Sequence, residues 1–275
     1  MKNIIKADPA GFCMGVRRAV NMVEEELTGD KTIYTLGPII HNQQVLDRLQ
    51  ARGVKMAQSP DDVEGDCTLV IRAHGVEPET EQILREKGIN LADGTCPKVK
   101  QSHRIIEEYS EKGFFIVILG DKNHGEVKGL AGRANRHIVV STPEEAEKLT
   151  LPRETLLICQ TTVKLDEFDC IKEILLAKNP DLAVKNMICP ATRKRQTAVK
   201  ELAAKVQAMV VVGGKGSANT KRLYQTALEQ GIAAFHVETA GEITEEMKRY
   251  DTIGVTAGAS TPDDIIEEVM DALRG

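Results

Sequence analysis

Three of the six cysteines stand at matched positions along the chain, and matched cysteines can act together as ligands of a metal centre. Cys13, Cys96 and Cys189 each end a short apolar run, and a basic, helix-compatible stretch follows each of them. In all three cases the next β-rich run ends in a glycine 24 residues beyond the cysteine. Those glycines are Gly37, Gly120 and Gly213. Because three thiolates at one point would repel one another, the pattern predicts a cation between them.

The kind of metal centre is left open by the cysteines alone. Three thiolates and a water suit zinc, whereas a [4Fe–4S] cluster with three cysteines would leave one iron open to bind a substrate. Three separate buried cysteines, each acting as a small apolar residue, are the structural alternative. Cys67, Cys159 and Cys170 break the pattern and are assigned to packing.

The elements around these cysteines form a threefold repeat of strands and helices. Strand-like and helix-like segments alternate throughout, which is typical of α/β proteins with parallel sheets. We predict three similar βα units over residues 1–96, 97–189 and 190–275, arranged about a pseudo-threefold axis around a central cluster. Ligands of parallel sheets bind beyond the carboxyl ends of the strands, where all three cysteines lie.

Polar side chains gather in the loops that follow the predicted strands. Imidazole, amide and hydroxyl groups there can share the charge of a diphosphate through hydrogen bonds. The candidates are His41, His74, His124, Gln160, Thr161, Thr162, Ser217, Asn219 and Ser260. Glu126 follows His124 by two residues and could deliver protons near an open iron. His103, His137 and His236 are interpreted as surface residues or as core residues with satisfied hydrogen bonds.

Composition and charge exclude several classes of protein. The net charge is −5 and the pI about 5.8, so the large basic face of a nucleic-acid-binding protein is not expected. The apolar runs fall short of the about 18 residues that a membrane helix needs. The N-terminus lacks the apolar core of a secretory signal. We therefore expect a cytoplasmic protein without a nucleic-acid or membrane partner.

The motifs, taken in order, resemble those of the 4-hydroxy-3-methylbut-2-enyl diphosphate reductase family of the non-mevalonate isoprenoid pathway. The resemblance covers nearly the whole chain and is specific as a set. It is carried by AGFCMGVRRAV, GPIIHN, RAHGV, DGTCPKVKQSH, NHGEV, QTT, CPATRKRQ, SANT and TAGASTP.

The resemblance implies both a cofactor and a reaction. It implies one [4Fe–4S] cluster per chain, held by Cys13, Cys96 and Cys189, with its fourth iron free for the allylic hydroxyl of the substrate. Reductive removal of that hydroxyl would give isopentenyl diphosphate and dimethylallyl diphosphate. Electrons would come from a ferredoxin- or flavodoxin-type donor, and we expect a monomer.

The resemblance also implies roles for individual residues. His41, His74, Ser217, Asn219 and Ser260 would hold the diphosphate. The residues around the hydroxyl would be His124, Thr161 and Glu126, with Glu126 as the proton source. Ala218 stands where the family often has a second serine, so only its backbone N–H could bind the substrate there. The alternatives are a quinolinate synthase-like [4Fe–4S] dehydratase and a zinc-stabilised binding scaffold.

Overall fold

Three four-stranded parallel sheets organise the protein, as a computed structural model of residues 2–275 shows. The first sheet has the order β3 (Lys55–Ala57), β2 (Thr32–Leu36), β4 (Cys67–Ile71), β5 (Asn90–Asp93). The second has the order β7 (His137–Val140), β6 (Phe115–Leu119), β8 (Thr155–Cys159), β9 (Ala183–Lys185). The third has the order β1 (Asn3–Lys6), β12 (Thr252–Ala257), β10 (Ala208–Val212), β11 (Ala233–Val237).

Helices connect the strands, as parallel pairing requires. The α-helices are α1 (Met14–Glu26), α2 (Gln43–Ala51), α3 (Pro78–Glu86), α4 (Pro97–Glu111), α5 (Gly125–Ala131), α6 (Pro143–Glu147), α7 (Leu165–Lys178), α8 (Pro190–Ala203), α9 (Ala218–Leu228) and α10 (Asp263–Arg274). Short 3₁₀ turns are η1 (Pro60–Asp62), η2 (Ala240–Glu242) and η3 (Met247–Arg249). Within residues 2–275, no helix is both long and apolar enough to span a membrane.

The chain divides into two compact units. The first comprises the chain up to Arg17, Ile40–Ala51 and Pro190–Gly275, and the second comprises Arg18–Ile39 and Arg52–Cys189. The third sheet belongs to the first unit, and the other two sheets belong to the second unit. The α/β prediction of three similar parallel units is thus confirmed, and the pseudo-threefold arrangement stays a prediction.

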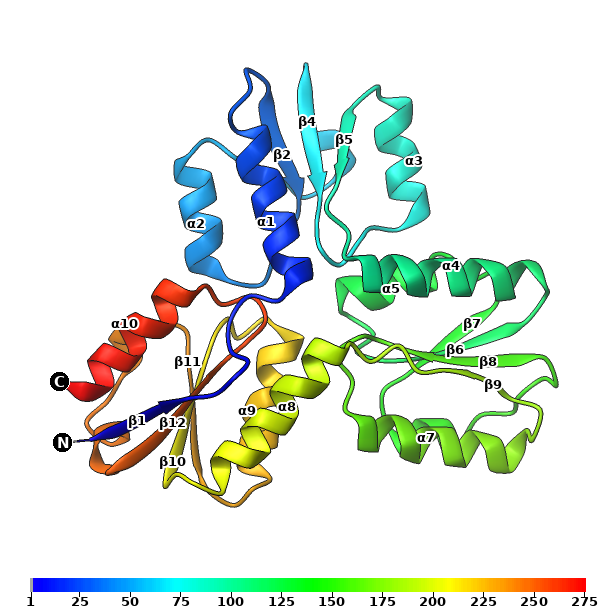
Figure 1. The fold of residues 1–275 in the computed structure, drawn as a ribbon. Coiled ribbons are helices and arrows are strands. Elements are labelled where there is room, and N and C mark those ends of the chain that lie inside the picture. Colours follow the sequence, from blue (N-terminus) through cyan, green and yellow to red (C-terminus); the bar gives the residue numbers. More distant parts are fainter. Residues whose placement is uncertain (1) are drawn as a thin grey trace. The chain divides into compact units, whose positions relative to one another are not determined.

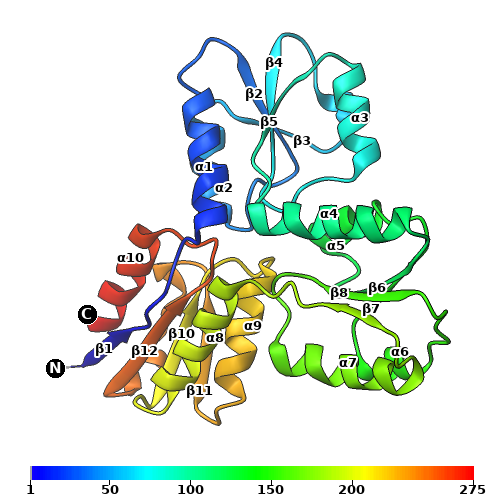
Figure 2. The same cartoon turned by 45° about the vertical axis from the view of Figure 1, so that its right-hand side comes forward.

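The sheets are covered by helices on both faces, which is why their central strands read as continuous apolar runs. In the third sheet, Val210 and Val212 belong to the core beneath α10, whereas Met209 and Val211 belong to the core beneath α8 and α9. Figure 1 shows α10 on one side of this sheet and α8 and α9 on the other. Figure 2 shows α4 and α5 on one side of the second sheet and α7 on the other. Burying each such valine stabilises the fold by about 1.5 to 3 kcal/mol.

The repeat extends to individual backbone hydrogen bonds. A glycine directly follows β2, β6 and β10, one strand in each sheet. Each of these glycines donates its N–H to the carbonyl of the last residue in the neighbouring edge strand, which is β3, β7 or β11. The pairs are Gly37 to Ala57 at 2.7 Å, Gly120 to Val140 at 3.0 Å, and Gly213 to Val237 at 2.9 Å. Equal positions in the sequence repeat are therefore equal positions in the structure.

The first strand of the chain joins the third sheet. β1 pairs in parallel with β12, with Asn3 opposite Thr252 and Lys6 opposite Val255. Each sheet therefore takes as its fourth strand the one that leads into a cysteine: β5 before Cys96, β9 before Cys189 and β1 before Cys13. The predicted boundaries at residues 96 and 189 stay a prediction, with β1 belonging by pairing to the sheet of residues 190–275.

Candidate functional site

The three matched cysteines have the same local structure. Each is half-buried and directly precedes a helix, namely α1, α4 or α8. Each also donates its backbone N–H to the carbonyl of the second residue after a sheet strand. The bonds are Cys13 to Ala259 at 3.1 Å, Cys96 to Ala73 at 3.0 Å, and Cys189 to Thr161 at 2.9 Å. The repeat thus sets all three thiols at the carboxyl end of a sheet.

The position before a helix suits a thiolate ligand. Helix N-termini present unpaired N–H groups and partial positive charge, which favour a negative sulfur. At Cys13 one of these donors is visible, since the Val16 N–H bonds the Cys13 Sγ at 3.5 Å. Within the same unit, the buried Arg195 donates from Nη2 to the Gly11 carbonyl at 2.6 Å, which fixes the loop before Cys13.

The other three cysteines differ from this pattern. Cys67 in β4 and Cys159 in β8 are buried in their sheets, which confirms their assignment to packing. Burial raises the pKa of Cys159 to about 12, so this thiol stays protonated. The packing assignment is wrong for Cys170, which is exposed on α7. Phe168 and Ile171 occupy the core face of that helix instead.

Glu126 and Thr161 form a buried hydrogen-bonded pair in the second unit. Glu126 is the second residue of α5, and only 2% of its surface is exposed. Its two carboxyl oxygens accept from the Thr161 N–H at 2.7 Å and the Thr161 Oγ1 at 2.8 Å. Burial raises the pKa of Glu126 to about 7, and the two bonds from Thr161 partly oppose that rise. A carboxyl group that titrates near neutrality can both give and take a proton.

His124 is held in one tautomer by the same helix start. As the N-cap residue of α5, it accepts the Glu126 N–H on Nδ1 at 3.1 Å. A neutral His124 therefore carries its proton on Nε2. The His74 ring meets the His124 ring edge to face, with centroids 5.0 Å apart and planes at 87°. His124 thus lies against the Glu126 backbone, and His74 lies against the His124 ring.

Four of the predicted diphosphate-binding residues belong to the first unit and lie around the start of α9, whereas His74 belongs to the second unit. Ser217 is the N-cap of α9 and accepts the Thr220 N–H at 3.3 Å. Ser260 donates from Oγ to the His41 carbonyl at 3.0 Å. A Cβ at Gly214 would lie 2.4 Å from that same carbonyl, so the backbones approach closely there. His41, Ser217 and Ser260 are therefore brought to one place.

Asn219 is the feature of this loop that calls for a ligand. It is buried, with 6% of its surface exposed, and neither its Oδ1 nor its Nδ2 has a hydrogen-bond partner among residues 2–275. Leaving a buried amide unpaired costs about 1 to 3 kcal/mol per group. Ala218, just before it, is the first residue of α9, so its N–H lies at a helix N-terminus that favours anions. The oxygens of a diphosphate could accept hydrogen bonds from the Asn219 Nδ2 and from the Ala218 N–H, whereas the Asn219 Oδ1 would need a donor.

The remaining polar positions considered from the sequence are Gln160 and three further histidines, and they differ in burial and hydrogen bonding. Gln160 accepts the Asp121 N–H on Oε1 at 3.1 Å, and its buried Nε2 has no partner in the described chain. The interpretation as a surface or satisfied core residue fits His137, which is exposed, and His236, which contacts the Gly213 carbonyl through Nε2 at 2.8 Å. It is wrong for His103, which is buried and whose Nε2 has no hydrogen-bond partner in the described chain. Sequence reasoning singled out neither Arg72 nor Arg195, although both stand inside quoted motifs.

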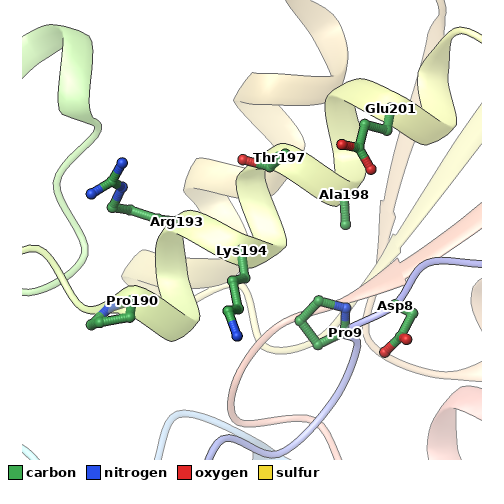
Figure 3. A pocket seen from close by; sticks show the side chains of 8 residues that line it. All are labelled: Asp8, Pro9, Pro190, Arg193, Lys194, Thr197, Ala198 and Glu201. Carbon is green, nitrogen blue, oxygen red and sulfur yellow. The ribbon is translucent and has the colours of Figure 1, made fainter.

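An open cavity of about 420 Å³ lies elsewhere in the first unit, beside α8. Figure 3 shows Arg193 and Lys194 toward one end of it and Glu201 toward the other. None of the predicted site residues lines this cavity. It is therefore not our candidate for the substrate site.

The fold and the site together define a class of α/β protein with three parallel sheets and one helix-preceding cysteine leading out of each. A family model described as LytB protein matches residues 4–274. The chain belongs to the LytB protein family.

Curated relatives span almost the full length of the chain. The 4-hydroxy-3-methylbut-2-enyl diphosphate reductase of Caldanaerobacter subterraneus subsp. tengcongensis is 43% identical over 278 residues, covering 98% of this chain and 96% of the relative. The protein of the same name from Aquifex aeolicus is 43% identical over 281 residues, covering 100% and 96%.

Solved structures agree with these relatives. The E-1-hydroxy-2-methyl-but-2-enyl-4-diphosphate reductase of Plasmodium falciparum is 30% identical, with a TM-score of 0.95 over 100% of this chain and 88% of that chain. A solved (E)-4-hydroxy-3-methyl-but-2-enyl diphosphate reductase is 41% identical, with a TM-score of 0.73 over 100% of this chain and 99% of that chain. The family resemblance seen in the sequence is confirmed.

Proposed function

We propose that the protein reduces 4-hydroxy-3-methylbut-2-enyl diphosphate to isopentenyl diphosphate and dimethylallyl diphosphate. The reaction consumes two electrons and two protons, breaks the C–O bond of the allylic hydroxyl and releases water. The single observation that carries the proposal is the buried Glu126–Thr161 pair, whose carboxyl pKa of about 7 suits a proton donor at neutral pH. Family membership supports the substrate, since the relatives above are named for it.

The cysteines fit the cofactor that the family resemblance implies. Cys13, Cys96 and Cys189 share one local structure, are half-buried and precede helices, so they offer three equivalent thiolate ligands. We infer that they hold one [4Fe–4S] cluster per chain. When bound, such a cluster with an open iron supplies electrons and a Lewis acid for the hydroxyl. Three thiolate ligands are one fewer than a fully protein-ligated cluster takes.

The protein's own groups would do the rest of the work. Ser217, Asn219 and the Ala218 N–H would bind the diphosphate at the start of α9, with His41 and Ser260 beside them. His74 would add an imidazole to the anionic end. Binding energy from the diphosphate would then orient the allylic end for reaction.

At the hydroxyl end, proton transfer depends on the second unit. Glu126 in its protonated form would protonate the departing oxygen, because hydroxide is a poor leaving group. Thr161 holds both carboxyl oxygens through its N–H and Oγ1. His124 would donate from Nε2, since its Nδ1 is occupied by the Glu126 N–H.

The setting of the enzyme is part of the same proposal. We infer a cytoplasmic monomer that takes electrons from a donor of ferredoxin or flavodoxin type. The family match favours the reductase over a quinolinate synthase-like dehydratase and over a zinc-stabilised scaffold.

Anaerobic purification tests the proposal directly. The protein should be brown, with broad absorption at about 400 nm from thiolate-to-iron charge transfer, and should convert the allylic diphosphate with reduced methyl viologen as donor. Colourless protein with one tightly bound zinc, or brown protein without turnover, would contradict it.

A further inference from the structure

His74 lies in a four-residue turn from Arg72 to Gly75, and two hydrogen bonds between Arg72 and Gly75 close this turn. Arg72 is the first residue after β4, and its carbonyl accepts the Gly75 N–H at 2.9 Å. Its side-chain Nε donates back to the Gly75 carbonyl at 3.0 Å. Gly75 has a φ of +76°, a conformation that favours glycine. The Arg72 side chain therefore fixes the loop in which His74 stands.

The Arg72 guanidinium also reaches the start of α5. A Cβ built on Gly125 would lie 2.9 Å from the Arg72 Nη2 and 3.1 Å from its Cζ, and its three nearest atoms all belong to Arg72. Gly125 stands between His124 and Glu126. The guanidinium thus lies against the backbone that presents both of these side chains.

Partial burial of the Arg72 guanidinium costs desolvation free energy, which its contacts with the two loops must offset. Burial lowers the pKa of Arg72, and the charge of Glu77 partly opposes that effect. An arginine nevertheless stays charged in a protein. The planar guanidinium of Arg72 lies between the turn that ends at Gly75 and the start of α5 at Gly125. A flexible lysine side chain would hold neither of them in a fixed geometry.

Gly125 has no conformational reason to be glycine. Its backbone is helical, without the positive φ that penalises other residues. Alanine in a helix is ordinarily more favourable than glycine. The close approach of Arg72 accounts for the missing side chain.

We propose that Arg72 is a positioning residue that fixes the His74 loop against the start of α5, and so sets His74 relative to His124 and Glu126. The inference rests on the proposed function for its catalytic consequence. The contact itself does not depend on which substrate is used.

The test is a double-mutant cycle of Arg72→Ala, Gly125→Ala and the two combined, assayed with the allylic diphosphate and reduced methyl viologen. A new Cβ at Gly125 displaces the guanidinium, so each single variant should lose about tenfold in kcat/KM, through lower kcat and higher KM. The combined variant should lose no more than either alone, because one contact is removed twice. Gly129→Ala is the matched control, since its Cβ would meet ordinary contacts at 3.6 Å and beyond.

Two further measurements separate positioning from other roles. Arg72→Lys keeps the charge but not the fork, so it should lose activity as Arg72→Ala does; full activity in this variant would overturn the proposal. So would losses that multiply in the combined variant, or an Arg72→Ala variant within twofold of the parent.

The free energy of unfolding is also measured without substrate for the parent, Arg72→Ala, Gly125→Ala and the combined variant. These four values report the Arg72–Gly125 contact independently of catalysis. We expect the two substitutions to be coupled there. If the parent has no turnover, the proposed function fails, and coupling or its absence in unfolding still supports or refutes the contact.

Discussion

Replacing Thr161 by valine should move the pH dependence of the reaction in a calculable direction. Glu126 has a pKa of about 7 because burial raises it while the two bonds from Thr161 lower it. Valine has nearly the shape of threonine but lacks the Oγ1 that donates to Glu126 at 2.8 Å. The backbone N–H bond at 2.7 Å does not depend on the side chain and remains. The substitution thus removes one of two stabilising donors from the carboxylate.

The magnitude follows from the energy of that hydrogen bond. A bond to a charged group contributes about 1.5 kcal/mol at the lower end of its range, and one pKa unit corresponds to about 1.36 kcal/mol. The pKa of Glu126 should therefore rise from about 7 to about 8. The protonated carboxyl is the proposed donor, so activity is present below this pKa and is lost as the pH rises through it. Thr161→Val should keep its activity to a higher pH than the parent.

The assay is kcat/KM against pH, which reports the pKa values of the free enzyme. Absolute rates in Thr161→Val will fall if Thr161 also touches the substrate, so the position of the alkaline limb is the readout. Thr161→Ser is the matched control, because it restores the hydroxyl and should return the limb to about 7. An unmoved limb in Thr161→Val, or an equal displacement in Thr161→Ser, would refute the assignment of Glu126 as the titrating donor.

The remaining predictions concern the donor, the metal ligands and the phosphate loop. Glu126→Gln should keep the absorption at about 400 nm but lose about 100-fold or more in kcat, and undiminished turnover would remove its role. Serine at Cys13, Cys96 or Cys189 should reduce bound iron, measured per chain, whereas Cys170→Ser should leave it unchanged because this thiol is exposed. Ala218→Ser should change KM by less than about threefold, since in the proposed site the backbone N–H at the helix start would already bind the anion; a large gain in affinity would contradict this.

The cysteine positions were predictable because the repeat marks them three times. One cysteine before a helix says little, whereas Cys13, Cys96 and Cys189 at equal spacing indicate one structural position used three times. The structure gives that position a physical meaning, in the shared N–H bond to the second residue after a strand. Cys170 was misjudged because an apolar neighbourhood in sequence does not say which face of a helix a residue occupies.

The pairing of Glu126 with Thr161 could not be predicted from the sequence. The two residues are 35 positions apart, and neither pattern nor spacing says that one loop bonds the other. The same holds for Arg72, whose partners are glycines and therefore leave no complementary side chain to suggest a contact. Contacts of this kind join a side chain to the backbone of another segment, so they can be identified only when the fold is known.

The pairing of β1 with β12 is a second long-range contact that the sequence pattern does not reveal, and it affects the loop that leads to Cys13. In sequence, the run before Cys13 resembles the runs before Cys96 and Cys189, but the strand it forms does not pair with a strand close to it in the chain. β1 finds its partner in β12, almost the whole chain away, with Lys6 opposite Val255. The Ala7 N–H continues this pairing by bonding the Val255 carbonyl at 2.8 Å. The loop to Cys13 therefore starts from a sheet edge, as the loops to the other two cysteines do. Under the proposed function, Cys13 is one of three cluster ligands. An unpaired N-terminal segment would lose conformational entropy when its cysteine bound a metal, whereas the pairing of β1 with β12 orders the start of this loop before any metal binds.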